Sequence, residues 1–202
     1  MKVVLHICCG VCAAGAVEAL SREGHHVIGF FYNPNIHPAE EYQKRLDVAY
    51  RVAKELKFPL EAGPYTPEEW FSLTGSLKDE PEGGRRCQIC YRLRLEKTHD
   101  YMVACGADAF TTTLTISPHK SAKVINSIGQ EISGEKFLIR DFKKKDGFKR
   151  AVQLAKKWEL YRQDYCGCTY SLWQNPPFSK GENREELFPK GGTQPLPLLK
   201  GD

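Results

Sequence analysis

The sequence predicts an α/β protein in which helices cover both faces of a parallel sheet, giving three layers. The first observation behind this is that short β-branched runs alternate along the chain with longer segments of helical periodicity. The second is composition, because 202 residues with 41% apolar and 27% charged side chains suit one globular core. Sheets of this kind bind ligands at the carboxyl ends of their strands, so motifs that follow strands carry the most functional weight.

The first half of the chain supplies strand-like runs that alternate with helical segments. The β-branched apolar run at residues 2–7 ends in Cys8-Cys9-Gly10, after which an alanine-rich helix is expected. Gly24 ends that helix, and Asn33-Pro34-Asn35 closes the second run. The predicted order is strand 2–7, helix 12–22, strand 26–32, helix 40–56, extended segment 59–61 and helix 68–73.

The second half continues the same alternation. Tyr91, Leu95 and Cys105 recur at helical spacing, so a long helix is predicted up to Cys105, with Gly106 ending it. Cys105 belongs to the apolar stripe of this helix and is interpreted as a packing residue. The predicted order is helix 87–105, strand 108–114, a helix from Ser117-Pro118-His119 to about residue 132, strand 137–140 and helix 148–160.

Composition also sets the expected domain boundary and cell compartment. Proline, glycine and charged residues without period follow residue 173, so we expect one domain over residues 1–173 and an extended tail over 174–202. The first residues imitate a secretion signal, but His6 and Cys8 interrupt the apolar run early. No stretch approaches the ~20 apolar residues of a membrane-spanning helix. The sequence therefore favours a cytoplasmic protein, away from membranes, with reduced thiols.

Seven of the eight cysteines are clustered, and reduced clustered thiols usually hold metal. A structural zinc site needs only four ligands, and a redox dithiol needs two, so either would leave thiols over. Spacing alone leaves zinc and iron open, but the surplus favours a 4Fe-4S cluster with further thiols for a second metal or for redox chemistry. The clustered residues are Cys8, Cys9, Cys12, Cys87, Cys90, Cys166 and Cys168.

Other functions of an α/β sheet find less support in the sequence. An ATP-hydrolysing relative would carry a Ser/Gly-rich phosphate loop after the first strand, where this chain has Cys8-Cys9-Gly10. The net charge of +4 permits a polyanionic partner without requiring one. Single histidines such as His6, His37 and His119 are more often packing or surface residues than proton donors.

Four motifs give the chain a resemblance to a known family. They are LHICCGVC (residues 5–12), RRCQICYRLR (85–94), TTTLTISPHK (111–120) and DYCGC (164–168). Together they resemble the cobalamin-independent epoxyqueuosine reductase family, QueH, up to about Leu172. The resemblance implies a fold of the adenine nucleotide alpha hydrolase type, which is HUP- or Rossmann-like. It also implies a 4Fe-4S cluster, an additional iron nearby, and the last step of queuosine synthesis on tRNA.

The resemblance leads to a hypothesis for the metal site and the chemistry. Removing the epoxide oxygen of epoxyqueuosine needs two electrons, two protons and a Lewis acid on the oxygen. Asp164 is the candidate oxygen ligand or proton donor, although a solvated loop carboxylate explains it equally well, and Cys8 is the candidate catalytic thiol. The expected cluster ligands are Cys9, Cys87, Cys90 and Cys166, which leaves Cys8, Cys12 and Cys168 for the second iron or as redox thiols.

Substrate binding is expected to use basic groups beside the cysteines. Arg85 and Arg86, with Arg92 and Arg94, and the run Lys143–Lys145 are candidates to face a tRNA anticodon stem-loop, although a solvated charged face explains the lysines equally well. Candidates to line the substrate pocket are Thr112, Ser117 and His119. The electron donor is unidentified. The rival from another class is a zinc-stabilised RNA-binding module without chemistry, which would be colourless.

Overall fold

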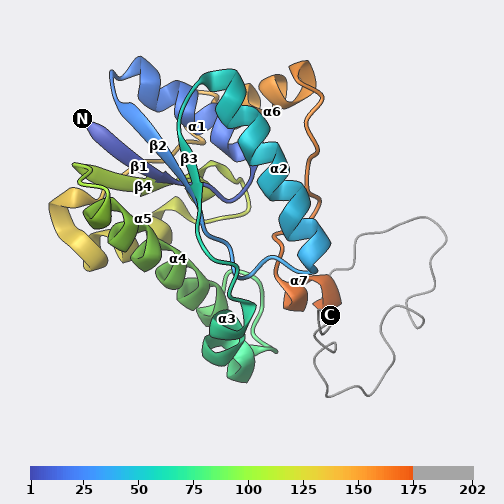
Figure 1. Cartoon of the computed structure of the whole chain (residues 1–202). Coiled ribbons are helices and arrows are strands. Elements are labelled where there is room, and N and C mark those ends of the chain that lie inside the picture. The colour runs from blue at the N-terminus through green and yellow to red at the C-terminus, as the bar shows by residue number, and fades with distance from the viewer. Residues whose placement is uncertain (175–202) are drawn as a thin grey trace, which may run out of the picture.

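The computed structural model describes residues 1–174, and a parallel four-stranded sheet lies at its centre (Figure 1). The strand order is β3-β2-β1-β4, and the register pairs Lys2 with His26 across β1 and β2, and Val3 with Ala109 across β1 and β4. The β-branched and aromatic runs form these strands because both of their faces are covered by helices. The strands are β1 (Lys2–His6), β2 (His26–Phe31), β3 (Leu60–Ala62) and β4 (Ala109–Thr112).

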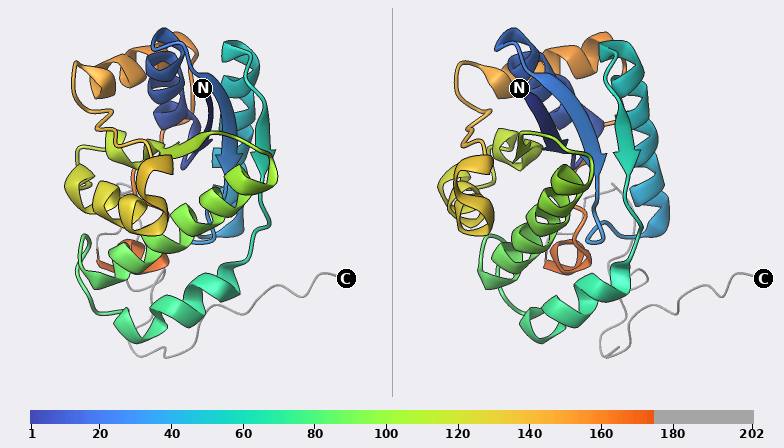
Figure 2. Two further views of the ribbon diagram at one scale, coloured as in Figure 1. Left: turned by 90° about the vertical axis from the view of Figure 1, so that its left-hand side faces the viewer. Right: turned by 60° about the vertical axis from the view of Figure 1, so that its left-hand side comes forward.

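Helices cover both faces of the sheet, which confirms the three-layered α/β prediction (Figures 1 and 2). One layer contains α1 (Gly10–Arg22), α2 (Ala39–Leu56) and α6 (Gly147–Lys157). The other contains α4 (Arg85–Ala104) and α5 (Ala122–Ser133). Helices α3 (Pro67–Thr74) and α7 (Thr169–Gln174) lie beyond the carboxyl ends of the strands, and the 3-10 turns are η1 (Gly75–Leu77), η2 (Thr113–Ile116) and η3 (Gly134–Lys136).

Alternate residues of β1 enter two different apolar clusters, as the two-residue period of a strand requires. Val3 and Leu5 pack in the cluster under α1, α2 and α6, whereas Val4 packs in the cluster under α4 and α5. Helices α1 and α2 approach closely at Gly10, where an added Cβ would lie 2.5 Å from Val48 Cγ1. This contact fixes the start of α1, and with it the cysteines on either side of Gly10.

The structure departs from the sequence prediction beside β4. The strand predicted over residues 137–140 is absent: Phe137 makes one isolated bridge to Phe110, and the Leu138 carbonyl accepts from Thr111 Oγ1 instead of extending the ladder. Strand β4 itself ends at Thr112, because the Thr112 hydroxyl accepts the Leu114 N–H and starts η2.

The carboxyl end of the described chain also differs. Helix α7 was not predicted, and it includes Gln174, the first residue of the expected tail. The rest of that tail lies outside the described residues. Within residues 1–174, no helix has the length and apolar character needed to span a membrane.

Candidate metal centre and substrate cavity

The cysteines gather where the strand order reverses, beside the carboxyl end of β1. Strand β1 lies between β2 and β4, and Cys8 and Cys9 come one residue after its end. Cys9 is the N-cap of α1, and the Cys8 N–H donates to Thr113 Oγ1, just after β4, at 3.1 Å. Open parallel sheets bind ligands at such reversal points, because neighbouring connections there leave in opposite directions.

Three cysteines form the N-terminal thiol group, Cys8, Cys9 and Cys12, whose sulfurs all lie within 4.8 Å of one another. The start of α1 sets this spacing, because the Cys12 N–H donates to Cys9 Sγ at 3.4 Å in the manner of a helix cap. Gln163 Nε2 also donates to Cys9 Sγ, at 2.9 Å, and Thr113 Oγ1 donates to Cys8 Sγ, at 3.2 Å. Three sulfurs this close together can serve as ligands to one metal ion.

The protons within this group are unevenly shared. Hydrogen bonds from the thiols of Cys12 and Cys9 hold the pKa of Cys8 well below its usual range, and Thr113 adds to the effect. Donation to Cys8 raises the pKa of Cys12 well above its usual range. Cys8 is therefore the thiol of this group that loses its proton most readily.

Four other cysteines line a small cavity of about 20 Å³, named here the four-thiol cavity. Cys87 and Cys90 stand in the first two turns of α4, and the three-residue spacing places both on one helix face. Cys166 and Cys168 come from the loop before α7, where Gly167 has a φ of +98°. A side chain at Gly167 would be strained and would also meet Ile36 Cγ1 at 2.9 Å.

Hydrogen bonds to sulfur occur in this group as well. The Gly83 N–H donates to Cys87 Sγ at 3.2 Å, and the Cys168 N–H donates to Cys166 Sγ at 3.4 Å. The Cys168 thiol lowers the pKa of Cys166 well below its usual range, and that same bond raises the pKa of Cys168. Four thiols around one small cavity, two of them accepting backbone hydrogen bonds, match the number of ligands that an iron-sulfur cluster takes.

A buried ion pair on α2 anchors the loop that carries Cys166 and Cys168. Arg45 Nε donates to Glu41 Oε1 at 2.6 Å, and both side chains are more than nine-tenths buried. The other guanidinium nitrogens of Arg45 donate to the carbonyls of Tyr165 and Cys166, at 3.1 and 3.2 Å. Tyr161 donates to the second oxygen of Glu41 at 2.7 Å. This network attaches the loop to α2, which lies across the sheet from α4, so Arg45 positions Cys166.

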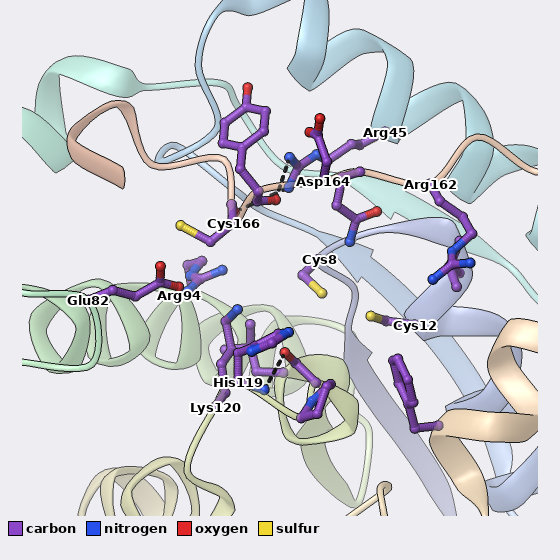
Figure 3. A pocket seen from close by; sticks show the side chains of 17 residues that line it. Cys8, Cys12, Arg45, Glu82, Arg94, His119, Lys120, Arg162, Asp164 and Cys166 are labelled. Atoms are coloured by element: carbon purple, nitrogen blue, oxygen red, sulfur yellow. Dashed lines mark hydrogen bonds between the residues drawn. The ribbon is translucent and has the colours of Figure 1, made fainter. Parts of the chain in front are cut away.

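A larger cavity of about 440 Å³ opens beside the thiols (Figure 3). Cys8, Cys12 and Cys166 lie along it, so it reaches both thiol groups. Its volume is sufficient for a nucleoside-sized ligand. The charged and ionisable side chains that line it are Arg45, Glu82, Arg94, His119, Lys120, Arg162 and Asp164.

The structure groups the cysteines differently from the sequence hypothesis. Cys9 was assigned to the cluster with Cys87, Cys90 and Cys166, but its sulfur lies among those of Cys8 and Cys12. Cys168 was assigned to the second iron, but it lines the four-thiol cavity. The hypothetical division had no such geometry to use, because sequence order gives no information on which loops meet across the carboxyl edge. Cys105 stays apart from both groups, partly buried against the second apolar cluster, as predicted.

Two predicted substrate-binding residues are corrected by their burial. Thr112 is 0% exposed, its hydroxyl is bonded to His6 Nδ1 at 2.9 Å, and it lines neither cavity. Arg86 is 1% exposed and donates through NH1 to the carbonyls of Leu77, Lys78 and Glu80, so it does not face an RNA phosphate.

The other predicted residues keep positions that permit their roles. Ser117, His119 and Asp164 line the larger cavity, and Arg85 is exposed at the start of α4. Of the lysine run, Lys143 is held inward, because its Nζ donates to the carbonyls of Thr115 and Lys120. Arg85, Ser117 and His119 therefore stay predicted substrate-binding residues.

Sequence reasoning missed several residues of the site. Arg45 and Gln163 carried no signal, because their partners are distant in the sequence. Gln163 is 154 residues from Cys9, and Arg45 is 121 residues from Cys166. Arg94 was expected to face tRNA, but it is 3% exposed and lines both cavities, because it follows Cys90 by one helical turn and shares its face. Lys120 and Arg162 line the larger cavity and have no cysteine beside them in the sequence.

Fold and site together define a three-layered parallel α/β protein with a group of thiols at the carboxyl end of its first strand. The fold resembles a predicted subunit of a tRNA methyltransferase from Methanocaldococcus jannaschii, with a TM-score of 0.53, 16% identity and coverage of 77% and 74% of the two chains. It also resembles the U34-tRNA thiolase NcsA from Methanococcus maripaludis, solved with its [4Fe-4S] cluster, with a TM-score of 0.54, 14% identity and coverage of 85% and 61%. At these identities the likeness establishes the fold alone.

Sequence comparison then gives the family. The model of epoxyqueuosine reductase QueH matches residues 3–174, and the chain belongs to this family of oxidoreductases. It is 38% identical to epoxyqueuosine reductase QueH of Streptococcus pyogenes serotype M1, over 84% of this chain and 70% of that protein. It is 36% identical to the QueH of Thermotoga maritima, over 94% of this chain and 97% of that protein. The family prediction made from the four motifs is therefore confirmed.

Proposed function

We propose that the protein reduces epoxyqueuosine in tRNA to queuosine, using an iron-sulfur cluster and a second iron. Membership of the QueH family supports the reaction, and the observation that carries the cofactor assignment is the pair of thiol groups beside one cavity. The tRNA substrate is proposed to enter through its anticodon stem-loop, with the modified base in the larger cavity. The electrons come from an external one-electron donor.

The number of thiols in each group suggests which metal it binds. Cys87, Cys90, Cys166 and Cys168 offer four thiols, the usual ligand number for a 4Fe-4S cluster. Cys8, Cys9 and Cys12 offer three, which leaves a coordination position for a substrate oxygen or for Asp164 on a single iron. When bound, these groups supply electrons one at a time and a Lewis acid for the epoxide oxygen.

The side chains of the larger cavity perform the remaining tasks. The departing oxygen takes up two protons as it becomes water, and the carboxyl of Asp164 and the imidazole of His119 are the proton-carrying groups at the cavity surface. Lys120 and Arg162 place positive charge along the same wall, where they attract the phosphates that flank the base. Ser117 offers a hydroxyl to the cyclopentane diol of the substrate.

The metal content tests this proposal directly. Protein purified without oxygen is expected to contain about five irons and four sulfides per chain, because a 4Fe-4S cluster and one further iron would be present. The measurement is iron, zinc and acid-labile sulfide per chain, together with the conversion of epoxyqueuosine in tRNA followed by mass spectrometry. Stoichiometric zinc without sulfide, in colourless protein, would contradict the reductase and favour an RNA-binding module without chemistry.

The salt dependence of tRNA binding tests the proposed phosphate contacts. Replacing both Arg85 and Arg162 by glutamine is expected to weaken binding and to flatten the slope of log affinity against log salt by about 1.5, because about 0.7 to 0.9 of a counterion is released per phosphate contact. The Arg51→Gln protein serves as a control, since Arg51 is exposed on α2 and lines neither cavity. An unchanged slope in the double variant would contradict both contacts.

A further inference from the structure

Two buried arginines face the four-thiol cavity. Arg86 is 1% exposed and Arg94 is 3% exposed, and both line this cavity with Cys87, Cys90 and Cys166. They stand four residues before and four residues after Cys90 on α4, so the helix presents all three side chains on one face. Arg94 and Cys166 also line the larger cavity, where Figure 3 labels both, so the two cavities share these residues.

Neither guanidinium is neutralised by a carboxylate. Among the described residues, Arg86 and Arg94 form no ion pair, although Glu82 lies in the same cavity wall. Arg86 NH1 bonds to carbonyls, while its Nε and NH2 are buried without a hydrogen-bond partner. Arg94 donates through Nε to the Cys90 carbonyl at 3.1 Å. Their guanidiniums lie over the rings of Tyr170 and Tyr91, at 5.1 and 5.6 Å, which stabilises them without supplying negative charge.

Two uncompensated buried cations in the wall of one cavity would be strongly destabilising in an otherwise neutral site. A buried charge is costly unless an opposite charge lies nearby. The groups that can supply the opposite charge here are the thiolates of the cavity, since each deprotonated cysteine carries one negative charge. The positive charges of Arg86 and Arg94 are therefore balanced when the thiols are deprotonated, as thiols are when they bind metal.

We propose that Arg86 and Arg94 are the built-in counter-charges of the four-thiol metal centre and that they raise the reduction potential of the cluster bound there. This inference rests on the proposed function. A cluster held by four thiolates is an anion, and it gains one further negative charge when an external one-electron donor reduces it. Two cations in the buried wall stabilise the reduced form more than the oxidised form, because the attraction grows with the charge of the cluster.

The experiment compares charge-removing and charge-retaining variants of the anaerobically purified full-length protein. Arg94→Gln removes the charge but keeps an N–H donor, whereas Arg94→Lys retains the charge and loses the planar fork. The matched control is Lys97→Gln, which removes a positive charge from the half-exposed side of the same helix. The readout is the cluster's midpoint potential, from titration with dithionite followed by electron paramagnetic resonance, with iron and sulfide measured in parallel.

The expected result is a lower potential in Arg94→Gln. At a fixed solution potential its reduced-to-oxidised ratio falls at least about tenfold, which is about 59 mV for one electron, while Arg94→Lys and Lys97→Gln stay within about twofold of the unaltered protein. The double variant Arg86→Gln/Arg94→Gln is expected to lose iron and sulfide, because the oxidised cluster also loses its counter-charge.

Other outcomes would overturn the inference. Equal potentials in Arg94→Gln, Arg94→Lys and the unaltered protein, or equal cluster loss in both Arg94 variants, would show that Arg94 holds the fold and does not tune the metal centre. Full cluster content in the double variant with an unchanged potential would do the same for the pair. If the unaltered protein lacks sulfide, the proposed function fails first, which its own iron and sulfide values reveal before any variant is compared.

Discussion

The Cys168→Ser protein is expected to lose its sulfide-containing cluster and its epoxide-reducing activity together, with activity falling at least about 100-fold. Cys168 lines the four-thiol cavity, and its thiol is hydrogen-bonded to the sulfur of Cys166. A serine at this position therefore removes one of the four proposed ligands. The Cys9→Ser protein should behave differently, because Cys9 belongs to the N-terminal thiol group. It is expected to keep four sulfides per chain and to lose the additional iron. Iron and sulfide analysis of both proteins, with visible absorption, measures the difference.

Cys105→Ser provides the matched control for these serine variants. Its thiol lies at the end of α4, bonded to the Met102 carbonyl and remote from both thiol groups, so metal content and activity should be unchanged. Loss of sulfide in Cys9→Ser together with full sulfide in Cys168→Ser would contradict the grouping seen in the structure. That outcome would support the allocation of Cys9, Cys87, Cys90 and Cys166 to the cluster that sequence reasoning first suggested.

The Arg45→Met protein is expected to be destabilised by about 3 kcal/mol, because removing one partner of a buried ion pair leaves the other charge uncompensated. Glu41 would keep its bond from Tyr161, but the carbonyls of Tyr165 and Cys166 would lose their donors. Urea unfolding measures the loss of stability. We also expect weaker retention of iron during dilution, because the loop carrying Cys166 is no longer attached to α2.

A double-mutant cycle separates the ion pair from the anchoring of the loop. The protein with both Glu41→Gln and Arg45→Met should be less destabilised than the sum of the single variants, since no unpaired charge remains. The Lys44→Met protein is the control, because Lys44 is exposed beside Arg45 on α2. A loss of stability below about 1 kcal/mol in Arg45→Met, as for an exposed pair, would contradict the role assigned to the buried pair.

Much of the fold could be predicted because its signals are local. The apolar run of β1 and the alanine-rich start of α1 follow from the periods of strands and helices, and the structure places both within two residues of prediction. The strand predicted over residues 137–140 does not form, because a strand needs a continuous ladder of hydrogen bonds to a partner strand. The Leu138 carbonyl accepts a hydrogen bond from the Thr111 hydroxyl instead, which no local pattern indicates.

The sequence by itself predicted one shared site for the clustered thiols, because two of their three motifs follow a strand or begin a helix, and its four motifs identified the family. Only the tertiary structure decided which thiols are neighbours. Cys9 lies with Cys8 and Cys12 because it caps α1, and Cys168 lies with Cys87 and Cys90 because Arg45 of α2 holds the loop before α7, over 121 residues of sequence separation. The tertiary structure likewise decided that Arg86 faces the thiols and not solvent. Burial depends on what packs over α4 and not on the charge of the side chain.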